Sequence, residues 1–328
     1  MTSKRTFLAS TAGLLLGLSA SLRAQLAGKS VRIGFLAAIG AQAAQSLVQS
    51  FREGLREHGW VENRNLNIEY SYDSPGGPSL DDRATSLTKR ELSLIVADST
   101  PSALALKRAK ASLPVVFTAM SEPVETGVVE SLARPGRNFT GFTTVNTELM
   151  PKRIEVIKEL VPTVRRLVYL GDPEYPSHRH SVGEVSQVAG QLGLRVEPLE
   201  LRTGADFDGI MALGLDPRET VFVVEQSLFF VRHTEKAVAL ELQSKVPAMY
   251  AHRQFVERGG TVCYGVNIAA LYRRAGGTVD RILKGARPAD LPVERPTKFD
   301  LVINLKTARA LGLKISQSFL ARVDQAIE

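Results

Sequence analysis

Short apolar runs rich in β-branched residues alternate along the chain with longer stretches in which apolar residues recur every three or four positions. The short runs predict buried strands, and the longer stretches predict amphipathic helices. In the first half, strands are expected at residues 31–36, 66–72, 93–97 and 115–118, and helices at 43–58, 80–90, 102–110 and 124–132. Strands that alternate with helices at this spacing indicate parallel βαβ units in a doubly wound sheet.

The alternation restarts after residues 139–146 and predicts a second lobe similar to the first. Helices are expected at 149–160, 182–192 and 230–244, and strands at 166–170, 195–201, 221–224, 248–250 and 261–264. The N-terminal lobe then covers residues 25–143 and the C-terminal lobe residues 144–263. Residues 264–328 are interpreted as a return segment, which contains a helix at 271–283 that returns to the N-terminal lobe, a hinge crossing and a C-terminal tail. The stretch 298–304 is expected to lead to the N-terminal lobe or the hinge. The expected fold class is α/β, with two doubly wound parallel-sheet lobes.

The first 24 residues have the order of a secretory signal peptide. Lys4 and Arg5 precede an uncharged run from residue 6 to 22, and Ala24 provides a small residue before the expected cleavage point. The run is too short and too mixed for a comfortable membrane span, although an uncleaved anchor stays an alternative. Lys4-Arg5 resembles a twin-arginine pair only faintly, which leaves the export route open. Because no cysteine lies near residue 24, we expect an exported protein that is not a lipoprotein.

Composition and charge fit an ordinary soluble globular protein of about two domains. The 328 residues are 44% apolar and 23% charged, and 41 Lys plus Arg against 34 Asp plus Glu give a formal charge of +7. Removal of residues 1–24 would leave 38 basic against 34 acidic residues, or +4, which predicts no nucleic-acid partner. The single cysteine, Cys263, excludes an intramolecular disulfide and a cysteine-cluster metal site, and its apolar neighbours indicate a buried inert thiol.

The sequence lacks the motifs of phosphate loops, dinucleotide folds, zinc proteases and serine hydrolases. His178 and His180 flank Arg179, and we interpret them as solvent-exposed because a cation beside them disfavours a metal ion. The sequence therefore predicts no catalytic residue, no metal site and no cofactor. A secreted hydrolase or isomerase on the same fold is an alternative for which no nucleophile–base pair is evident.

Small and polar residues follow most of the predicted strands, at the sheet edge where open α/β sheets bind ligands. In Ser99-Thr100-Pro101 the hydroxyl groups open a helix, a pattern that serves equally as an N-cap and as an anion pocket for a ligand carboxylate. Two series of polar strand ends that face one another describe a cleft between the lobes. The candidate ligand-binding residues are Ala38, Ser99, Thr100, Thr118, Ser121, Asp172, Tyr175, Glu225, Gln226, Tyr250 and Asn267.

Several ordered blocks resemble the ABC-transporter substrate-binding protein family that includes tryptophan- and other aromatic-amino-acid-binding members. The blocks are FREGLREHGWVENRNL at 51–66, SLARPGRNFTG at 131–141, KRIEVIKELVP at 152–162, LYRRA at 271–275, ILKGARPADLPVE at 282–294 and TKFDLVINLKTA at 297–308. The resemblance runs from about Val31 to Glu328. It implies the type I periplasmic-binding-protein architecture, in which two α/β lobes joined by a multi-crossing hinge clamp a ligand. The hinge residues are then Thr143, Asn146, Tyr264 and Gly265.

The role that the resemblance implies is capture of a small solute in the periplasm and its delivery to an ABC permease in the inner membrane. We expect a monomer, and a periplasmic ligand-sensing module for a membrane signalling partner is the alternative. By position, Ser99 and Thr100 match the family's cap before a proline. Thr118 and Ser121 match its second cleft loop, and Asn267 matches the polar residue of the second crossing.

Departures from the family pattern bear on the ligand. The family often has Gly-Asp-Pro where this chain has Ser-Glu-Pro at 121–123, and an acid where it has Gln226 followed by Ser227. That acid would pair with a ligand ammonium, whereas the adjacent Glu225 points to the opposite face of its strand. The expected solute is a small carboxylate, an amino acid or an aromatic acid, and the missing acid favours one without an amine. Tyr175, Tyr250 and Tyr264 either stack on an aromatic ligand or fill the lobe interface.

Overall fold

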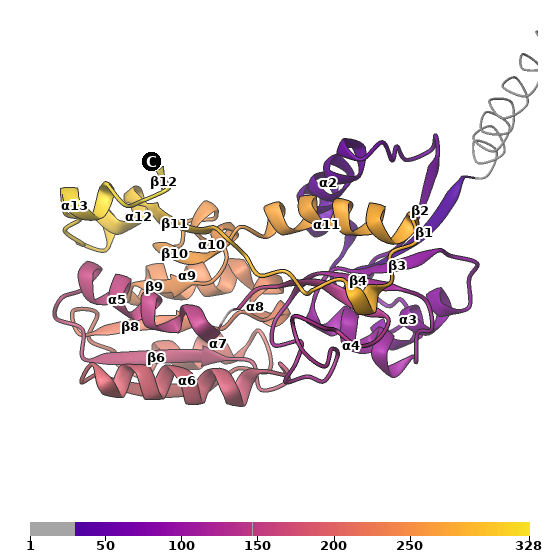
Figure 1. Cartoon of the computed structure of the whole chain (residues 1–328). Coiled ribbons are helices and arrows are strands. Elements are labelled where there is room, and N and C mark those ends of the chain that lie inside the picture. Colours follow the sequence, from indigo (N-terminus) through magenta and orange to yellow (C-terminus); the bar gives the residue numbers. More distant parts are fainter. Residues whose placement is uncertain (1–29, 146) are drawn as a thin grey trace, which may run out of the picture.

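The computed structural model describes residues 30–145 and 147–328, which form two α/β lobes side by side (Figure 1). The expected signal peptide, residues 1–24, and the expected hinge residue Asn146 lie outside the described residues. Each lobe has one sheet with helices packed on its faces (Figure 1). Within 30–145 and 147–328, no helix is long and apolar enough to cross a membrane. The expected α/β class with two parallel-sheet lobes is confirmed.

The N-terminal lobe contains a five-stranded parallel sheet with the strand order β2-β1-β3-β4-β5. Its strands are β1 (Val31–Leu36), β2 (Leu66–Ser71), β3 (Leu94–Ala97), β4 (Val115–Met120) and β5 (Phe139–Thr143). The connecting helices are α2 (Ala41–Glu57), α3 (Leu80–Thr88) and α4 (Thr100–Arg108). The central strands β3 and β4 consist almost wholly of buried side chains, because helices cover both faces of the sheet.

The C-terminal lobe contains a seven-stranded sheet with the order β12-β11-β10-β9-β8-β6-β7. Its strands are β6 (Arg166–Gly171), β7 (Arg195–Glu200), β8 (Thr220–Val224), β9 (Ala248–Tyr250), β10 (Val262–Val266), β11 (Phe299–Asn304) and β12 (Gln325–Ile327). Its helices are α5 (Met150–Leu160), α6 (His178–Gln191), α7 (Asp206–Met211), α8 (Leu228–Arg232), α9 (Thr234–Ser244), α10 (Arg253–Glu257), α12 (Leu305–Ala310) and α13 (Gln317–Leu320). All neighbouring strands are parallel except β10 and β11.

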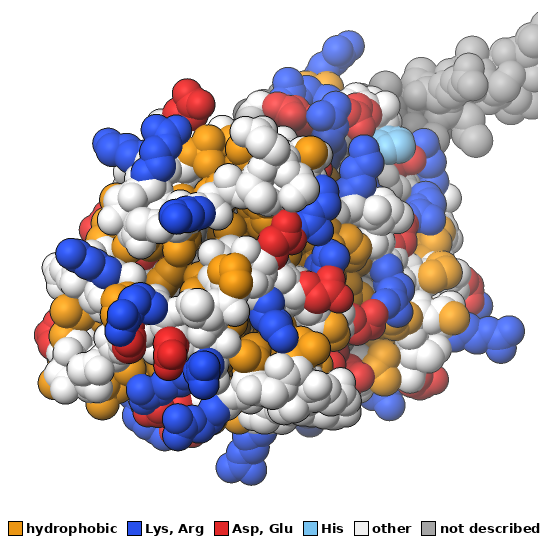
Figure 2. All heavy atoms as spheres, turned by 90° about the vertical axis from the view of Figure 1, so that its left-hand side faces the viewer, with side chains coloured by type: hydrophobic (Ala, Val, Ile, Leu, Met, Phe, Trp, Pro, Cys, Tyr) orange, Lys and Arg blue, Asp and Glu red, His pale blue; other side chains and the backbone are white. Residues whose placement is uncertain are grey.

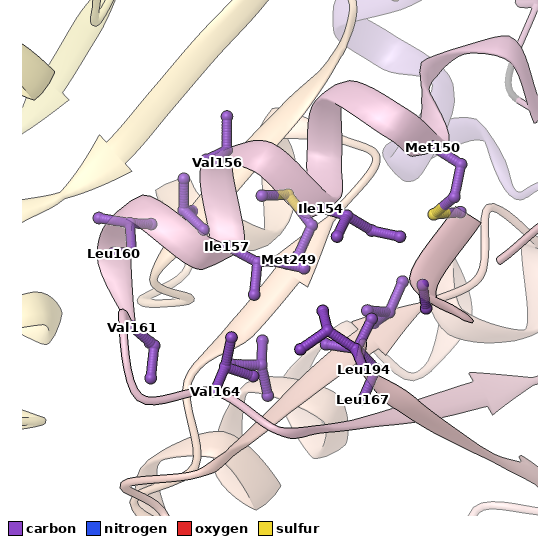
Figure 3. Packing of buried hydrophobic residues seen from close by; sticks show 14 of the residues in the cluster. Met150, Ile154, Val156, Ile157, Leu160, Val161, Val164, Leu167, Leu194 and Met249 are labelled. Carbon is purple, nitrogen blue, oxygen red and sulfur yellow. The ribbon is translucent and has the colours of Figure 1, made fainter. Parts of the chain in front are cut away.

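Helix α5 shows how the sequence pattern produces the core of this lobe. Its apolar residues recur at helical spacing, so Ile154, Ile157 and Leu160 lie on one buried face. In Figure 3 Ile154 and Ile157 lie beside Met249 of β9, and all of these residues belong to one apolar cluster with Leu167 of β6. The opposite face of the sheet has a separate apolar core with Phe222 and Tyr250 at its centre. Both faces of the sheet are therefore anchored, and the loops at its carboxyl edge have a rigid base.

The outer end of the C-terminal lobe carries charges of both signs. Figure 2 shows that end, with basic side chains spread among acidic and apolar ones. Exposed ion pairs such as Arg165–Glu219, with 3.5 Å between N and O, belong to such a solvated surface. Pairs of this kind contribute little to stability because water screens them.

Within the described residues the chain passes between the lobes three times. It leaves the N-terminal lobe after β5, returns after β10 as helix α11 (Ile268–Leu283), and leaves again before β11. Helix α11 lies against α2 of the N-terminal lobe (Figure 1). The third crossing runs beside the first, where the Thr143 N–H donates to the Glu294 carbonyl at 3.0 Å. The first and third crossings thus run side by side.

Four expectations about elements are wrong. Residues 124–132 form turns rather than a helix, because Gly127 adopts a left-handed φ of 64° after one turn. The helix expected at 230–244 is broken at His233 into α8 and α9. The segment 298–304 joins the C-terminal sheet as β11, antiparallel to β10, instead of leading to the N-terminal lobe or the hinge. The boundary expected at residue 263 falls inside β10, which continues to Val266.

Candidate functional site

A cavity of about 460 Å³ lies between the two lobes. It is lined by the loops after β1, β3 and β4 of the N-terminal lobe, by the loops after β6, β8 and β9 of the C-terminal lobe, and by the start of α11. In parallel sheets these loops lie at the carboxyl edge, which is where open α/β folds bind ligands. The two sheets therefore present their ligand-binding edges to one another.

Asp98 and Ser99 form the N-terminal wall of the cavity, at the start of α4. The Asp98 carboxylate accepts the Ala38 N–H at 3.1 Å and the hydroxyls of Ser99 and Ser102, each at 2.6 Å. Burial raises the pKa of Asp98, whereas these three donations favour its ionised form. The Ser99 hydroxyl turns to Asp98 and makes no capping bond to α4. The first N–H groups of α4 therefore lack a side-chain cap at the edge of the cavity.

A chain of hydroxyl groups connects the two lobes beside this wall. The Ser121 N–H donates to Thr100 Oγ1 at 2.9 Å, and Ser121 Oγ lies 3.0 Å from Thr144 Oγ1. From the other lobe, the Tyr175 hydroxyl donates to Ser121 Oγ at 3.0 Å. Burial raises the pKa of Tyr175 to about 12, so this phenol keeps its proton at neutral pH.

Arg232 makes a second contact between the lobes. From the end of α8 its guanidinium donates to the Ala38 carbonyl at 2.8 Å and to Asp73 Oδ2 at 2.7 Å. Both acceptors belong to the N-terminal lobe. The two hydrogen bonds of Arg232 and the one from Tyr175 to Ser121 hold the lobes against each other. The structure therefore has the closed form of a two-lobed protein.

A buried polar network supports the C-terminal wall from behind. Glu225 accepts the Tyr169 hydroxyl at 3.0 Å and the Asp172 N–H at 2.7 Å, and its carboxylate lies 3.1 Å from His178 Nδ1. The hydrogen bond to Glu225 raises the pKa of His178, which favours the charged imidazolium. The stability that this pair contributes is complete below about pH 6.5, the ordinary pKa of histidine, and is lost as the pH rises through the raised value.

The hinge side of the cavity contributes Asn267 and His252. Asn267 caps α11, because its Oδ1 accepts the Ala270 N–H at 3.0 Å, and its amide donates to Asp300 Oδ2 at 2.9 Å. Burial and the nearby positive charge of Arg153 lower the pKa of His252 to about 4, so its imidazole is neutral. Apolar side chains form much of the remaining lining: Ile39, Leu47, Leu228, Val231, Val266 and Ile268.

The structure brings together six of the residues expected at the cleft. Ser99, Thr100, Ser121, Tyr175, Gln226 and Asn267 line the cavity. Ala38, Thr118, Asp172, Glu225 and Tyr250 are buried behind it. The reason is visible at Tyr250, whose hydroxyl donates to Glu241 at 2.9 Å and whose ring stacks on Phe255 at 4.7 Å inside the C-terminal core. Thr118 similarly donates to the Asp98 carbonyl at 3.0 Å.

The expected hinge residues lie near the crossings, as far as they are described. Thr143 ends β5 at the first crossing. Gly265 lies in β10 where an added Cβ would be 1.9 Å from the Ala251 carbonyl oxygen, so glycine is required by this close approach. Tyr264 packs on Phe299, with ring centroids 6.2 Å apart, rather than lining the cavity.

Two further sequence expectations concern histidines and the cysteine. The expectation of an exposed His178 is wrong, because its ring is buried against Glu225, whereas His180 is exposed beside Glu184. Cys263 is buried as expected, and burial raises the pKa of its thiol to about 12. In the described part of the chain, no three His, Cys, Asp or Glu side chains cluster as metal ligands.

Several cavity residues were missed by sequence reasoning. Leu47 of α2 and Ile268 of α11 belong to the apolar wall of the cavity. Apolar residues at helical spacing look the same in a sequence whether they face a cavity or the protein core, so this wall was not predicted. His252, Arg253 and Arg258 belong to α10 or its flanks, a helix too short to be detected from periodicity.

The family model for ABC transporter substrate binding proteins matches residues 32–327. The chain belongs to this family. Its members bind solutes, which is a non-enzymatic role, and they act in the periplasm or outside the cell. A tyrosine-binding protein from Clostridioides difficile is 23% identical over 286 residues, which cover 87% of this chain and 82% of that protein.

Solved structures of similar proteins share the two-lobed fold. An ABC domain from Streptococcus pneumonia in complex with L-Trp superposes with a TM-score of 0.83 at 26% identity, covering 91% of this chain and 100% of that one. A conserved domain protein from Vibrio cholerae has the same TM-score at 25% identity and the same coverage. A ligand-free, open substrate-binding protein from Clostridium difficile gives 0.69 at 23% identity, covering 90% of this chain and 99% of that one. The type I periplasmic-binding-protein architecture expected from the sequence is thus confirmed for this substrate-binding protein.

Proposed function

We propose that this substrate-binding protein is the periplasmic component of an ABC import system and captures a small carboxylate-bearing solute, an amino acid or an aromatic acid, in the cavity between its lobes. The observation that carries the proposal is the cavity itself, which both lobes line and which their contacts close. At about 460 Å³ it is within the usual size range for a small-molecule site. Residues 1–24 would direct export, and an ABC permease would receive the solute.

The polar groups of the cavity are suited to a carboxylate. The start of α4 offers N–H groups and the positive end of a helix dipole, to which anions bind. Arg253 and Arg258 add positive charge to the lining. The apolar wall opposite would hold a hydrocarbon or aromatic group by burial. The similar proteins from Streptococcus pneumonia and Clostridioides difficile bind L-Trp and tyrosine, which are carboxylates of this size and shape.

Ser99→Ala is expected to weaken solute binding without weakening the fold. The substitution removes a hydroxyl that lines the cavity and helps to orient Asp98 at the start of α4, while no helix cap is lost. We expect the Kd of a bound solute to rise about tenfold, because Asp98 loses the donor that fixes its carboxylate at the start of α4. Calorimetric titration measures this change, and urea unfolding should show less than about 1 kcal/mol of destabilisation.

Ser79→Ala is the matched control. Ser79 lies outside the cavity lining and caps α3, where its Oγ accepts the Asp82 N–H at 3.1 Å. Its loss should cost about 1 kcal/mol of stability and leave the Kd unchanged. If Ser99→Ala instead lowers stability and spares affinity, as Ser79→Ala should, the start of α4 is structural and the proposed carboxylate site is wrong.

A further inference from the structure

Ser227 is a buried hydroxyl that the fold leaves without a partner. It follows β8, lines the cavity and is 3% exposed, yet its Oγ makes no hydrogen bond to any described group. A buried polar atom without a partner costs free energy, so its presence calls for an explanation. A polar atom of the solute would supply the missing partner, because Ser227 lines the same cavity from the C-terminal lobe.

The carboxylates that line the cavity are already occupied. Among the described residues of the lining, Asp98 and Glu257 are the acidic ones. Asp98 already accepts three hydrogen bonds, from Ala38, Ser99 and Ser102. Glu257 is exposed and accepts from Arg253 Nε at 2.8 Å. Glu257 is therefore paired with a cation, and the Asp98 carboxylate is satisfied by donors of its own lobe.

The acid two residues before Ser227 is turned away from the cavity. The side chain of Glu225 is fully buried and satisfies Tyr169, Asp172 and His178 behind the wall. The side chain that does face the cavity is the neutral Gln226. The C-terminal wall therefore offers a hydroxyl and an amide, where an ammonium group would need an anion to offset the loss of its hydration.

We propose that the cavity selects carboxylates that carry a hydroxyl group in the place of an amino acid's ammonium, and that Ser227 binds this hydroxyl. The class of solute is thus a 2-hydroxy carboxylate with an apolar or aromatic side group. A hydroxyl can both donate to and accept from the Ser227 and Gln226 side chains, and it enters the cavity uncharged. This inference deepens the proposed function and rests on it.

Two matched series of solutes test the inference by calorimetric titration at pH 7. The first contains L-tryptophan, L-indole-3-lactate and indole-3-propionate, and the second contains L-leucine, L-2-hydroxyisocaproate and 4-methylvalerate. In the series that fits the cavity, we expect the hydroxy acid to bind at least about tenfold more tightly than the amino acid, because a buried ammonium without an anion is penalised. Tighter binding of the amino acid would overturn the inference while leaving the proposed function intact. If no member of either series binds, the proposed function and the inference both fail.

Ser227→Ala identifies the group that makes the selection. The variant should bind the hydroxy acid about tenfold more weakly and the plain acid with unchanged affinity, since only the former meets the missing hydroxyl. It should fold normally, because Ser227 Oγ has no partner to lose. Ser79→Ala, outside the cavity, should leave the affinity for both acids unchanged. An equal loss for both acids, or none for either, would contradict the assignment of Ser227.

Discussion

Glu225→Ala should lower the free energy of unfolding by about 3–5 kcal/mol, the usual cost of removing one member of a buried ion pair. The side chain of Glu225 is fully buried, and that of His178 is 8% exposed. Loss of the carboxylate leaves the His178 ring, the Tyr169 hydroxyl and the Asp172 N–H without their common acceptor. Urea unfolding at pH 6 measures the effect, because in the parent protein the Glu225 carboxylate raises the pKa of His178 and favours the charged pair there.

Glu200→Ala is the control for this substitution. Its carboxylate also approaches His178, at 3.7 Å from Nε2, but it is about half exposed. Water screens such a contact, so we expect less than about 1 kcal/mol of destabilisation. Equal effects of the two substitutions would show that the network behind the cavity is held by something other than Glu225.

Gly276→Val should destabilise the protein by about 3 kcal/mol and weaken solute binding together. Helices α2 and α11 touch at Gly54 and Gly276, where an added Cβ at Gly276 would lie 2.3 Å from the carbonyl carbon of Gly54. No rotamer relieves a clash with backbone, so the helices must separate. Since α11 brings Asn267, Ile268 and Tyr272 to the cavity, its displacement also alters the site. Urea unfolding and calorimetric titration of the same samples test both effects.

Gly190→Ala provides the comparison for a glycine in a helix without such a contact. An added Cβ at Gly190 in α6 meets no atom within 4 Å. Alanine loses less backbone entropy on folding than glycine, so stability should rise by up to about 1 kcal/mol. A mild effect of Gly276→Val, like that of a surface substitution, would mean that α11 is not tightly docked on α2.

The alternation of strands and helices was sufficient to predict the lobes, because each βα unit has its own hydrophobic period. The alternation gave wrong predictions where contacts between distant residues determine the local structure. Residues 124–132 have a helical pattern, yet Gly127 and the flanking prolines at 123 and 135 favour turns. The segment 298–304 was not predicted as a strand, because its place as β11 depends on pairing with β10, which local sequence does not contain.

The sequence predicted which loops line the candidate site, but not which of the neighbouring side chains are buried behind it. Parallel strands bring their following residues to one edge, so Ser99, Ser121 and Gln226 were correctly placed at the cavity. Strand alternation also explains why Glu225 faces away from it. A shift of one residue along a strand decides whether its last side chain enters the core or the cleft. Tyr250, at the end of β9, lies in the core. No sequence pattern indicates that the Ser227 hydroxyl lacks a partner, since that follows from the packed structure.

Native mass spectrometry tests the central claim most directly, namely that the cavity between the lobes captures one small carboxylate without changing it. The purified protein is mixed with equal amounts of the two solute series and then desalted. We predict a single 1:1 complex whose solute is released on unfolding with its mass unchanged, and a clear loss of that complex in Ser99→Ala but not in Ser79→Ala. A protein that retains no solute from the mixture, or one that releases a chemically altered product, would contradict the account.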